Sequence, residues 1–303
     1  MKLKDLEIGT QQPITLMVKK IESATARNTS IYQRLTVRDS DGGEATILNW
    51  GGPLRMETPA VITANLETSE YREAPSYRLL NFQVDEKADI RSFLPKPRID
   101  AVKSWNDLVT MSKGIRESLR LVVGAVLTAN KESFKHLPLS QSRSYARQNG
   151  VLEATLKLCR LVDGICPQIG IDRDLALSGA MLYYIGAVDT IDSAFNYTSS
   201  DTLIGMGVSS YTKLMEQVTK SLAARDNVSK VIDLEEIKML GHILLSRSKG
   251  IQTSIPEALA LRHLDQIVTE TEMMESNMTD MEEGSSAFVN GQKIYKKSKK
   301  EEN

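Results

Sequence analysis

The sequence of 303 residues contains few of the residues that build metal centres and disulfide frameworks. Its three histidines and its two cysteines, Cys159 and Cys166, form no metal-ligand spacing, and it has no Walker, GxSxG or GxGxxG motif. No apolar run reaches the ~18 residues that span a bilayer, and residues 1–10 lack the apolar stretch of a signal peptide. We therefore expect a cytoplasmic protein without membrane segments, whose cysteines are reduced and buried.

The chain also lacks a strong charge of either sign. Its net charge of −1 excludes a protein that coats nucleic acid through bulk positive charge, although it permits a local basic groove. Apolar residues make up 41% and charged residues 25%, which is typical of a folded globular protein. A chain of this length is expected to form one large or two ordinary domains.

Residues 1–92 have the composition of short β-strands separated by turns. Strand-like runs at 14–21, 32–37, 44–50, 60–66 and 77–84 alternate with turn-forming stretches such as 39–43, DSDGG. About five short strands in this length resemble an OB-fold barrel. Trp50 and Phe82 are expected to fill the interior of this barrel, because small barrels need large inward side chains.

OB-folds bind single strands by stacking bases on exposed aromatic side chains beside Lys and Arg. The strand region offers tyrosines close to arginines, and these are the candidate nucleic-acid-binding residues. They are Tyr32, Arg34, Arg38, Tyr71, Arg72 and Tyr77. Basic and acidic residues are nearly balanced in this region, so we expect modest, salt-sensitive affinity.

The residue pattern changes after Pro95 and Pro97, which mark a linker at 93–103. From 104 to 275 apolar residues recur at helical spacing, with Ser104 as the expected first N-cap. Residues 276–303 form a polar tail, in which 287–295 is a candidate docked segment with a hairpin turn at Asn290-Gly291. The predicted fold class is α+β: a small N-terminal β-barrel, then an all-α domain.

Six segments in this order resemble the YhaM-type 3'-5' exoribonucleases, in which an OB-fold precedes an HD-superfamily phosphohydrolase domain. The likeness runs almost end to end. The segments are 150–156 (GVLEATL), 177–187 (LSGAMLYYIGA), 203–206 (LIGM), 242–250 (HILLSRSKG), 256–265 (PEALALRHLD) and 288–297 (FVNGQKIYKK). The resemblance implies an HD-like helical domain at 104–275 and self-association of the chain as a homo-oligomer.

The chemistry of this family needs histidines and carboxylates that hold divalent metal. This chain has other residues at nearly all of those positions. The substituted positions are Ala154, Tyr183, Tyr184, Met206, Arg247 and Ser248, whereas Asp265 is retained. One carboxylate cannot organise a metal by itself, so we expect no metal, no cofactor and a former site packed shut by apolar groups.

These patterns together favour a non-catalytic pseudoenzyme that binds single-stranded DNA or RNA or serves as an assembly or accessory protein, with a replication or RNA-processing protein as a possible partner. Two alternatives stay open. The first is a metal-dependent 3'-5' exoribonuclease or phosphohydrolase that rebuilt its site from Asp189, Asp192, Asp201 and Asp265. The second is a protein-interaction scaffold that binds no nucleic acid.

Overall fold

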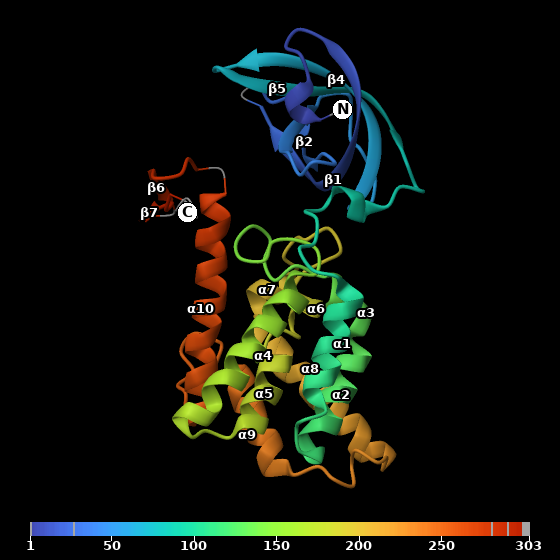
Figure 1. Cartoon of the computed structure of the whole chain (residues 1–303). Helices are drawn as coiled ribbons and strands as arrows, with labels where there is room; N and C mark the ends of the chain where they lie inside the picture. The colour runs from blue at the N-terminus through green and yellow to red at the C-terminus, as the bar shows by residue number, and fades with distance from the viewer. Residues whose placement is uncertain (1, 27, 280, 290, 299–303) are drawn as a thin grey trace. The chain divides into compact units, whose positions relative to one another are not determined.

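The computed structural model describes residues 2–26, 28–279, 281–289 and 291–298. The chain divides into two compact units, Met1–Lys96 and Pro97–Asn303, and the division lies between the two linker prolines, Pro95 and Pro97 (Figure 1). Within the described ranges, no helix is long and apolar enough to cross a membrane. As predicted, a β-barrel unit comes first and a helical unit follows it.

The first unit is a closed barrel in which strands pair in the order β1-β2-β3-β5-β4 and β4 returns to β1. All pairs are antiparallel except β3 with β5. The strands are β1 (Gln11–Thr25), β2 (Ile31–Arg38), β3 (Glu44–Asn49), β4 (Ala60–Tyr71) and β5 (Ala74–Val84), with short 3-10 turns η1 (Leu3–Asp5) and η2 (Ile90–Phe93). Five strands closed in this way have the architecture of an OB-fold.

Two turns set the register of this barrel. Between β2 and β3, the Asp39 carboxylate accepts hydrogen bonds from the backbone N–H groups of Asp41 and Gly43, at 2.9 and 2.8 Å. Between β4 and β5, Arg72 and Glu73 both have positive φ, which is the conformation of a two-residue hairpin turn. Strands β4 and β5 therefore run to the tip of their hairpin, whereas the sequence predicted strands only at 60–66 and 77–84.

The second unit is built from helices around α4 and α5. The helices are α1 (Ala101–Ser112), α2 (Glu117–Ala129), α3 (Lys131–His136), α4 (Gly150–Ile169), α5 (Arg173–Leu182), α6 (Ala187–Thr190), α7 (Ser199–Leu203), α8 (Met206–Ala224), α9 (Leu234–Leu245) and α10 (Pro256–Met278). Helix α5 packs against α2, α4, α9 and α10 (Figure 1). Gly179 permits the approach of α9, because a Cβ there would lie 2.7 Å from a methyl group of Ile243.

The ends of two predicted helices differ from the sequence-based expectation. Helix α1 begins earlier, because the Asp100 side chain accepts the Lys103 N–H at 2.8 Å, and Ser104 is a buried residue inside the helix. Helical spacing was expected throughout 104–275, but α7 and α8 are separated at Gly205, whose φ of 81° interrupts helical geometry. Pro256 is at the first turn of α10, where proline is favoured.

After α10 the chain forms a two-stranded ribbon of β6 (Ser286–Val289) and β7 (Gln292–Tyr295). This confirms the predicted hairpin, although Asn290 of its turn lies outside the described residues. The polar tail expected from 276 is therefore structured in large part: α10 continues to Met278 and the ribbon follows. Lys299 and Lys300 of the predicted lysine run also lie outside the described residues.

Candidate nucleic-acid interface

An aromatic pair lies on the outer surface of the barrel. Gln33 of β2 is paired with Asn49 of β3, which places Tyr32 opposite Trp50 immediately beyond the end of β3. Their rings are stacked, with centroids 4.5 Å apart and an interplanar angle of 18°. Trp50 is 40% exposed, so the expectation that it fills the barrel interior is wrong. Phe82, by contrast, is partly buried and packs against the barrel core, as predicted.

Two inward amides hold the segment that carries Trp50. The Asn49 side chain donates to the carbonyl of Gly52 at 2.7 Å and accepts from the Gly51 N–H at 3.0 Å. The Gln33 side-chain oxygen accepts from Asn49 at 3.1 Å and from the Leu54 N–H at 2.7 Å. Because both amides are buried, these bonds are protected from water and fix the loop after β3. The aromatic pair is therefore preorganised.

A pocket of about 300 Å³ opens beside the pair. Tyr32, Ile31 and Pro53 contribute to its largely apolar wall, and Ile31 is 75% exposed. An exposed apolar wall next to a stacked aromatic pair can accept a flat, uncharged ring. The site is thus suited to bases and carries no charge of its own.

Positive charge is supplied by arginines on the same outer face. Arg34 is paired with Leu48 of β3, and Leu48 is paired with Arg78 of β5, so the two arginines flank one apolar side chain. Arg34 is exposed, and the Arg78 side chain is 57% exposed with a weak contact to Glu67 at 3.6 Å. Both guanidinium groups are available to phosphates.

The other predicted barrel residues fall into two groups. Tyr71 and Arg72 lie at the exposed tip of the β4–β5 hairpin, with the Arg72 guanidinium 5.2 Å from the Tyr71 ring centre. Arg38, in contrast, is buried and forms an ion pair with Glu44 at 2.8 Å. Tyr77 is half-buried and its hydroxyl donates to the carbonyl of Leu3 at 3.3 Å; burial is the main cause that raises its pKa.

In the helical unit, several of the positions that the resemblance assigned to a metal site carry buried side chains. Tyr183 and Tyr184 are fully buried and meet edge to face, with centroids 5.5 Å apart. The Tyr184 hydroxyl donates to Asp265 at 2.6 Å, and burial followed by the Asp265 charge raises the pKa of Tyr184 well above its usual value. Ala154 is also fully buried, whereas Met206 is 9% exposed. Buried aromatic and apolar side chains therefore occupy these four positions.

One contact in this region was not predicted: the side chain of Arg247 lies against both tyrosine rings. The guanidinium of Arg247 lies 5.7 and 5.3 Å from the ring centres of Tyr183 and Tyr184. Its Nε atom is 3.7 Å from a carboxylate oxygen of Asp265. Arg247 therefore places a positive charge near the Asp265 carboxylate, which also accepts the Tyr184 hydroxyl. Ser248 next to it is half-buried, and its hydroxyl lies 2.6 Å from where a Cβ on Gly207 would be.

Two of the four aspartates proposed for a rebuilt site, Asp189 and Asp192, are engaged elsewhere. Asp189 forms an ion pair with Lys213 at 2.8 Å. Asp192 accepts the backbone N–H groups of Ala194 and Asn196, both at 2.8 Å. Across the described ranges there is no group of three or more His, Cys, Asp and Glu placed to hold a metal ion.

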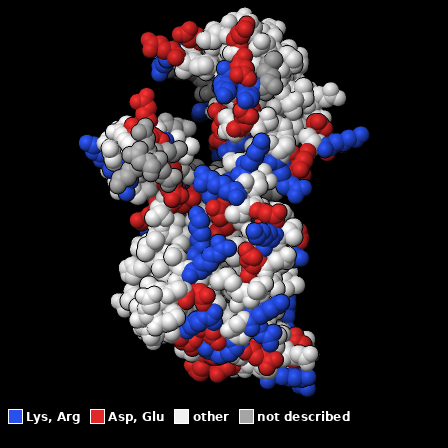
Figure 2. All heavy atoms as spheres, viewed as in Figure 1, with Lys and Arg blue, Asp and Glu red and all other residues white. Residues whose placement is uncertain are grey.

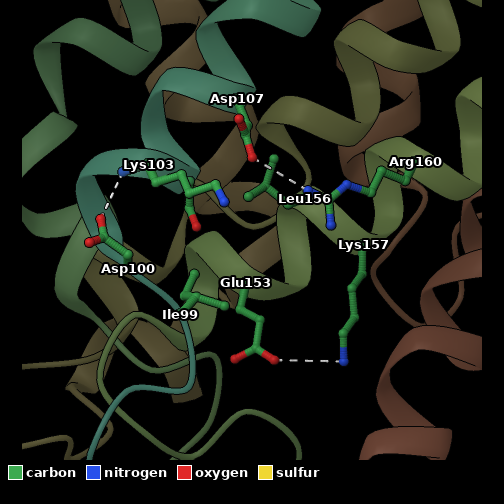
Figure 3. A pocket seen from close by; sticks show the side chains of 9 residues that line it. Ile99, Asp100, Lys103, Asp107, Glu153, Leu156, Lys157 and Arg160 are labelled. Carbon is green, nitrogen blue, oxygen red and sulfur yellow. Dashed lines mark hydrogen bonds and ion pairs between the residues drawn. The ribbon is translucent and has the colours of Figure 1, made fainter.

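A second pocket, of about 420 Å³, lies between α1 and α4 in the helical unit (Figure 3). Three acidic and three basic residues line it, and four of them are paired: Asp107 with Arg160 at 3.5 Å, and Glu153 with Lys157 at 3.6 Å. Figure 2 shows the same mixture of basic and acidic residues over the face of the helical unit in view. This pocket therefore has little net charge with which to attract a phosphate.

No protein-family model matches the chain. Among solved structures, it is similar in part to the mitochondrial single-stranded DNA binding protein Rim1 from S. cerevisiae, at 10% identity, over 27% of this chain and 100% of that chain, with a TM-score of 0.23. It is similar also to the second OB-fold domain of replication protein A from Methanococcus maripaludis, at 12% identity, over 29% and 97% of the chains, with a TM-score of 0.24. The assignment of the barrel rests on its own strand order.

Proposed function

We propose that this protein binds single-stranded nucleic acid on the outer face of its barrel. The observation that carries the proposal is the exposed stack of Tyr32 and Trp50 beside an apolar pocket. Bases stack on such rings for about 1–3 kcal/mol each, and they do so with little sequence preference. Arg34 and Arg78 contact the phosphates, and Tyr71 and Arg72 extend the surface along the β4–β5 hairpin.

The predictions for the helical unit, for self-association and for the location of the protein belong to the same proposal. In it, the helical unit is a degenerate HD-type domain that performs no catalysis and serves as a scaffold for self-association in the cytoplasm. Support comes from the packing around Asp265, where a guanidinium and two tyrosines occupy the space that a metal centre would need. The protein would then act as an accessory subunit in replication or RNA handling.

A titration of labelled single-stranded DNA and RNA, followed by fluorescence anisotropy at several salt concentrations, tests the proposal. Trp50→Ala should weaken binding about 5- to 150-fold, which corresponds to the 1–3 kcal/mol of one lost stacking contact. Trp50→Phe should keep most of the affinity, because a planar ring remains. Tyr197→Ala, which removes a 43% exposed tyrosine of the helical unit, is the matched control and should change nothing.

Three outcomes would overturn the proposal or part of it. Binding of Trp50→Ala within twofold of the wild type would show that the aromatic pair is not the interface. Absence of salt-dependent binding would favour the protein-interaction scaffold. Shortening of the oligonucleotide in the presence of Mn²⁺ would favour the metal-dependent nuclease.

A further inference from the structure

The C-terminal ribbon of β6 and β7 has two different faces. Cross-strand partners in an antiparallel ribbon share a face. The pairs Ala287–Ile294 and Val289–Gln292 therefore define one face, and the pairs Ser286–Tyr295 and Phe288–Lys293 define the other. Phe288 and Tyr295 are diagonal neighbours on this second face, within reach of one another.

The first face is anchored to the end of α10. Ile294 is only 4% exposed, and the Lys296 ammonium group donates to the carbonyls of Thr279 and Met281 at 3.2 and 2.6 Å. The Gly284 N–H in turn donates to the carbonyl of Lys296 at 2.8 Å. In Figure 1 the ribbon accordingly lies beside the C-terminal end of α10. These contacts fix the ribbon and leave its second face outward.

The outward face is apolar and basic at once. Phe288 is 75% exposed and Tyr295 is 54% exposed. Exposing two neighbouring aromatic rings to water costs free energy, so such a patch usually marks a binding surface. Lys293 lies directly opposite Phe288, and Lys297 is also exposed. From 284 to 300 the sequence contains five lysines, at 293, 296, 297, 299 and 300, and no Asp or Glu.

We propose that this outward face is a second binding site for single-stranded nucleic acid. Two bases stack on Phe288 and Tyr295, and Lys293 and Lys297 contact the adjacent phosphates. The inference depends only on residues of the ribbon, so it does not rest on the barrel interface.

The positive charge of this face favours single-stranded nucleic acid over the other molecules that could cover it. A second copy of the chain that used the same face symmetrically would bring Lys293 close to its own counterpart, and like charges at such an interface are unfavourable. An acidic single strand offers both a ring for each aromatic side chain and a negative charge for each lysine. The face is also small for a membrane anchor, which needs a larger apolar area.

The test uses the full-length protein and short oligonucleotides of about five nucleotides, oligo(dT) and oligo(U), which offer few bases beyond those that one site would bind. Affinity is measured by anisotropy for Phe288→Ala and for Tyr295→Ala, each in the wild-type and in the Trp50→Ala background. We expect each ribbon variant to weaken binding about fivefold or more in the Trp50→Ala background, where the ribbon is the main remaining site. Tyr197→Ala is again the aromatic control.

Two further variants keep the result interpretable if an alanine variant misfolds. Phe288→Trp retains a ring and should bind as well as the wild type. Lys293→Gln should lower the salt dependence of binding, while Lys113→Gln, at an exposed lysine of the helical unit, should not.

The proposal is overturned if the ribbon variants bind like their parent in both backgrounds. It is also overturned if they change the mass measured by light scattering and leave oligonucleotide affinity unchanged, because the face would then be a self-association surface. Loss of binding in the ribbon variants together with normal binding of Trp50→Ala would instead contradict only the barrel interface.

Discussion

Arg147 neutralises two buried carboxylates in the helical unit, and replacing it with methionine should strongly destabilise that unit. Its guanidinium donates to Glu153 at 3.0 and 2.9 Å and to Glu272 at 2.5 Å. The three side chains are 8%, 9% and 1% exposed, so water cannot replace the lost partner. Removing one member of a buried ion pair typically costs 3–5 kcal/mol, and we expect a loss of about 4 kcal/mol at pH 7 for Arg147→Met.

The loss should depend on pH in a defined direction. Burial opposes ionisation of Glu272, but the hydrogen bond and charge of Arg147, with smaller contributions from Arg98 and Ser276, outweigh it and lower the pKa of Glu272. In the wild type this carboxylate therefore adds stability above its unfolded-state pKa of about 4.3, and that stability disappears as the pH falls through the folded-state pKa. In Arg147→Met the pKa should instead be raised, so the difference between the two proteins should shrink from pH 7 towards pH 4.5.

Urea unfolding followed by far-UV circular dichroism measures this effect, because the helical signal reports on the helical unit. The control is Arg160→Met, at an arginine that is 62% exposed and 3.5 Å from Asp107, for which we expect a change below about 0.5 kcal/mol. A loss under 1 kcal/mol at pH 7, or one that grows as the pH falls, would refute the assignment of Arg147 as the neutralising partner.

Three further predictions concern the helical unit. Tyr184→Phe removes the hydroxyl that donates to Asp265 and should cost about 1–3 kcal/mol in urea unfolding; a neutral result would mean that this carboxylate is satisfied elsewhere. Gly150→Ala should cost about 3 kcal/mol or more, since its Cβ would lie 2.1 Å from the carbonyl oxygen of Tyr145, and an unchanged melting temperature would contradict this close approach. The two cysteines are at most 1% exposed and burial raises the pKa of both thiols, so Ellman's reagent should react with them only after unfolding; rapid reaction of the folded protein would disprove their burial.

The barrel could be predicted from the sequence because alternation and glycine turns specify strands locally. The orientation of Trp50 could not. Period-two alternation in 44–50 suggests that the polar Asn49 faces water and that Trp50 faces the core. In the barrel Asn49 and Gln33 face inward instead, because their amides bind the backbone of the loop after β3. The hydrogen bonds of Asn49 and Gln33 to the loop after β3 thus turn these amides inward and Trp50 outward, the reverse of the orientation that the alternation suggested.

In the helical unit, too, the sequence did not predict contacts between residues that lie far apart along the chain. The resemblance to HD-type nucleases predicted that tyrosine, alanine and methionine side chains would fill the space of a metal site. It did not indicate that Arg247 would lie against both rings and near Asp265, since these residues come from three separate segments of the chain. The relationship to HD-type nucleases stays a prediction, because it depends on short segments of sequence.

Ultraviolet cross-linking of the intact protein to single-stranded oligonucleotides, followed by mass spectrometric mapping, tests the central claim most directly. Stacked bases cross-link efficiently to aromatic side chains, so the account predicts cross-linked peptides that contain Tyr32 or Trp50, and their loss when duplex replaces the single strand. Cross-links confined to the helices of the second unit, or equal yields with duplex, would contradict binding at the barrel face.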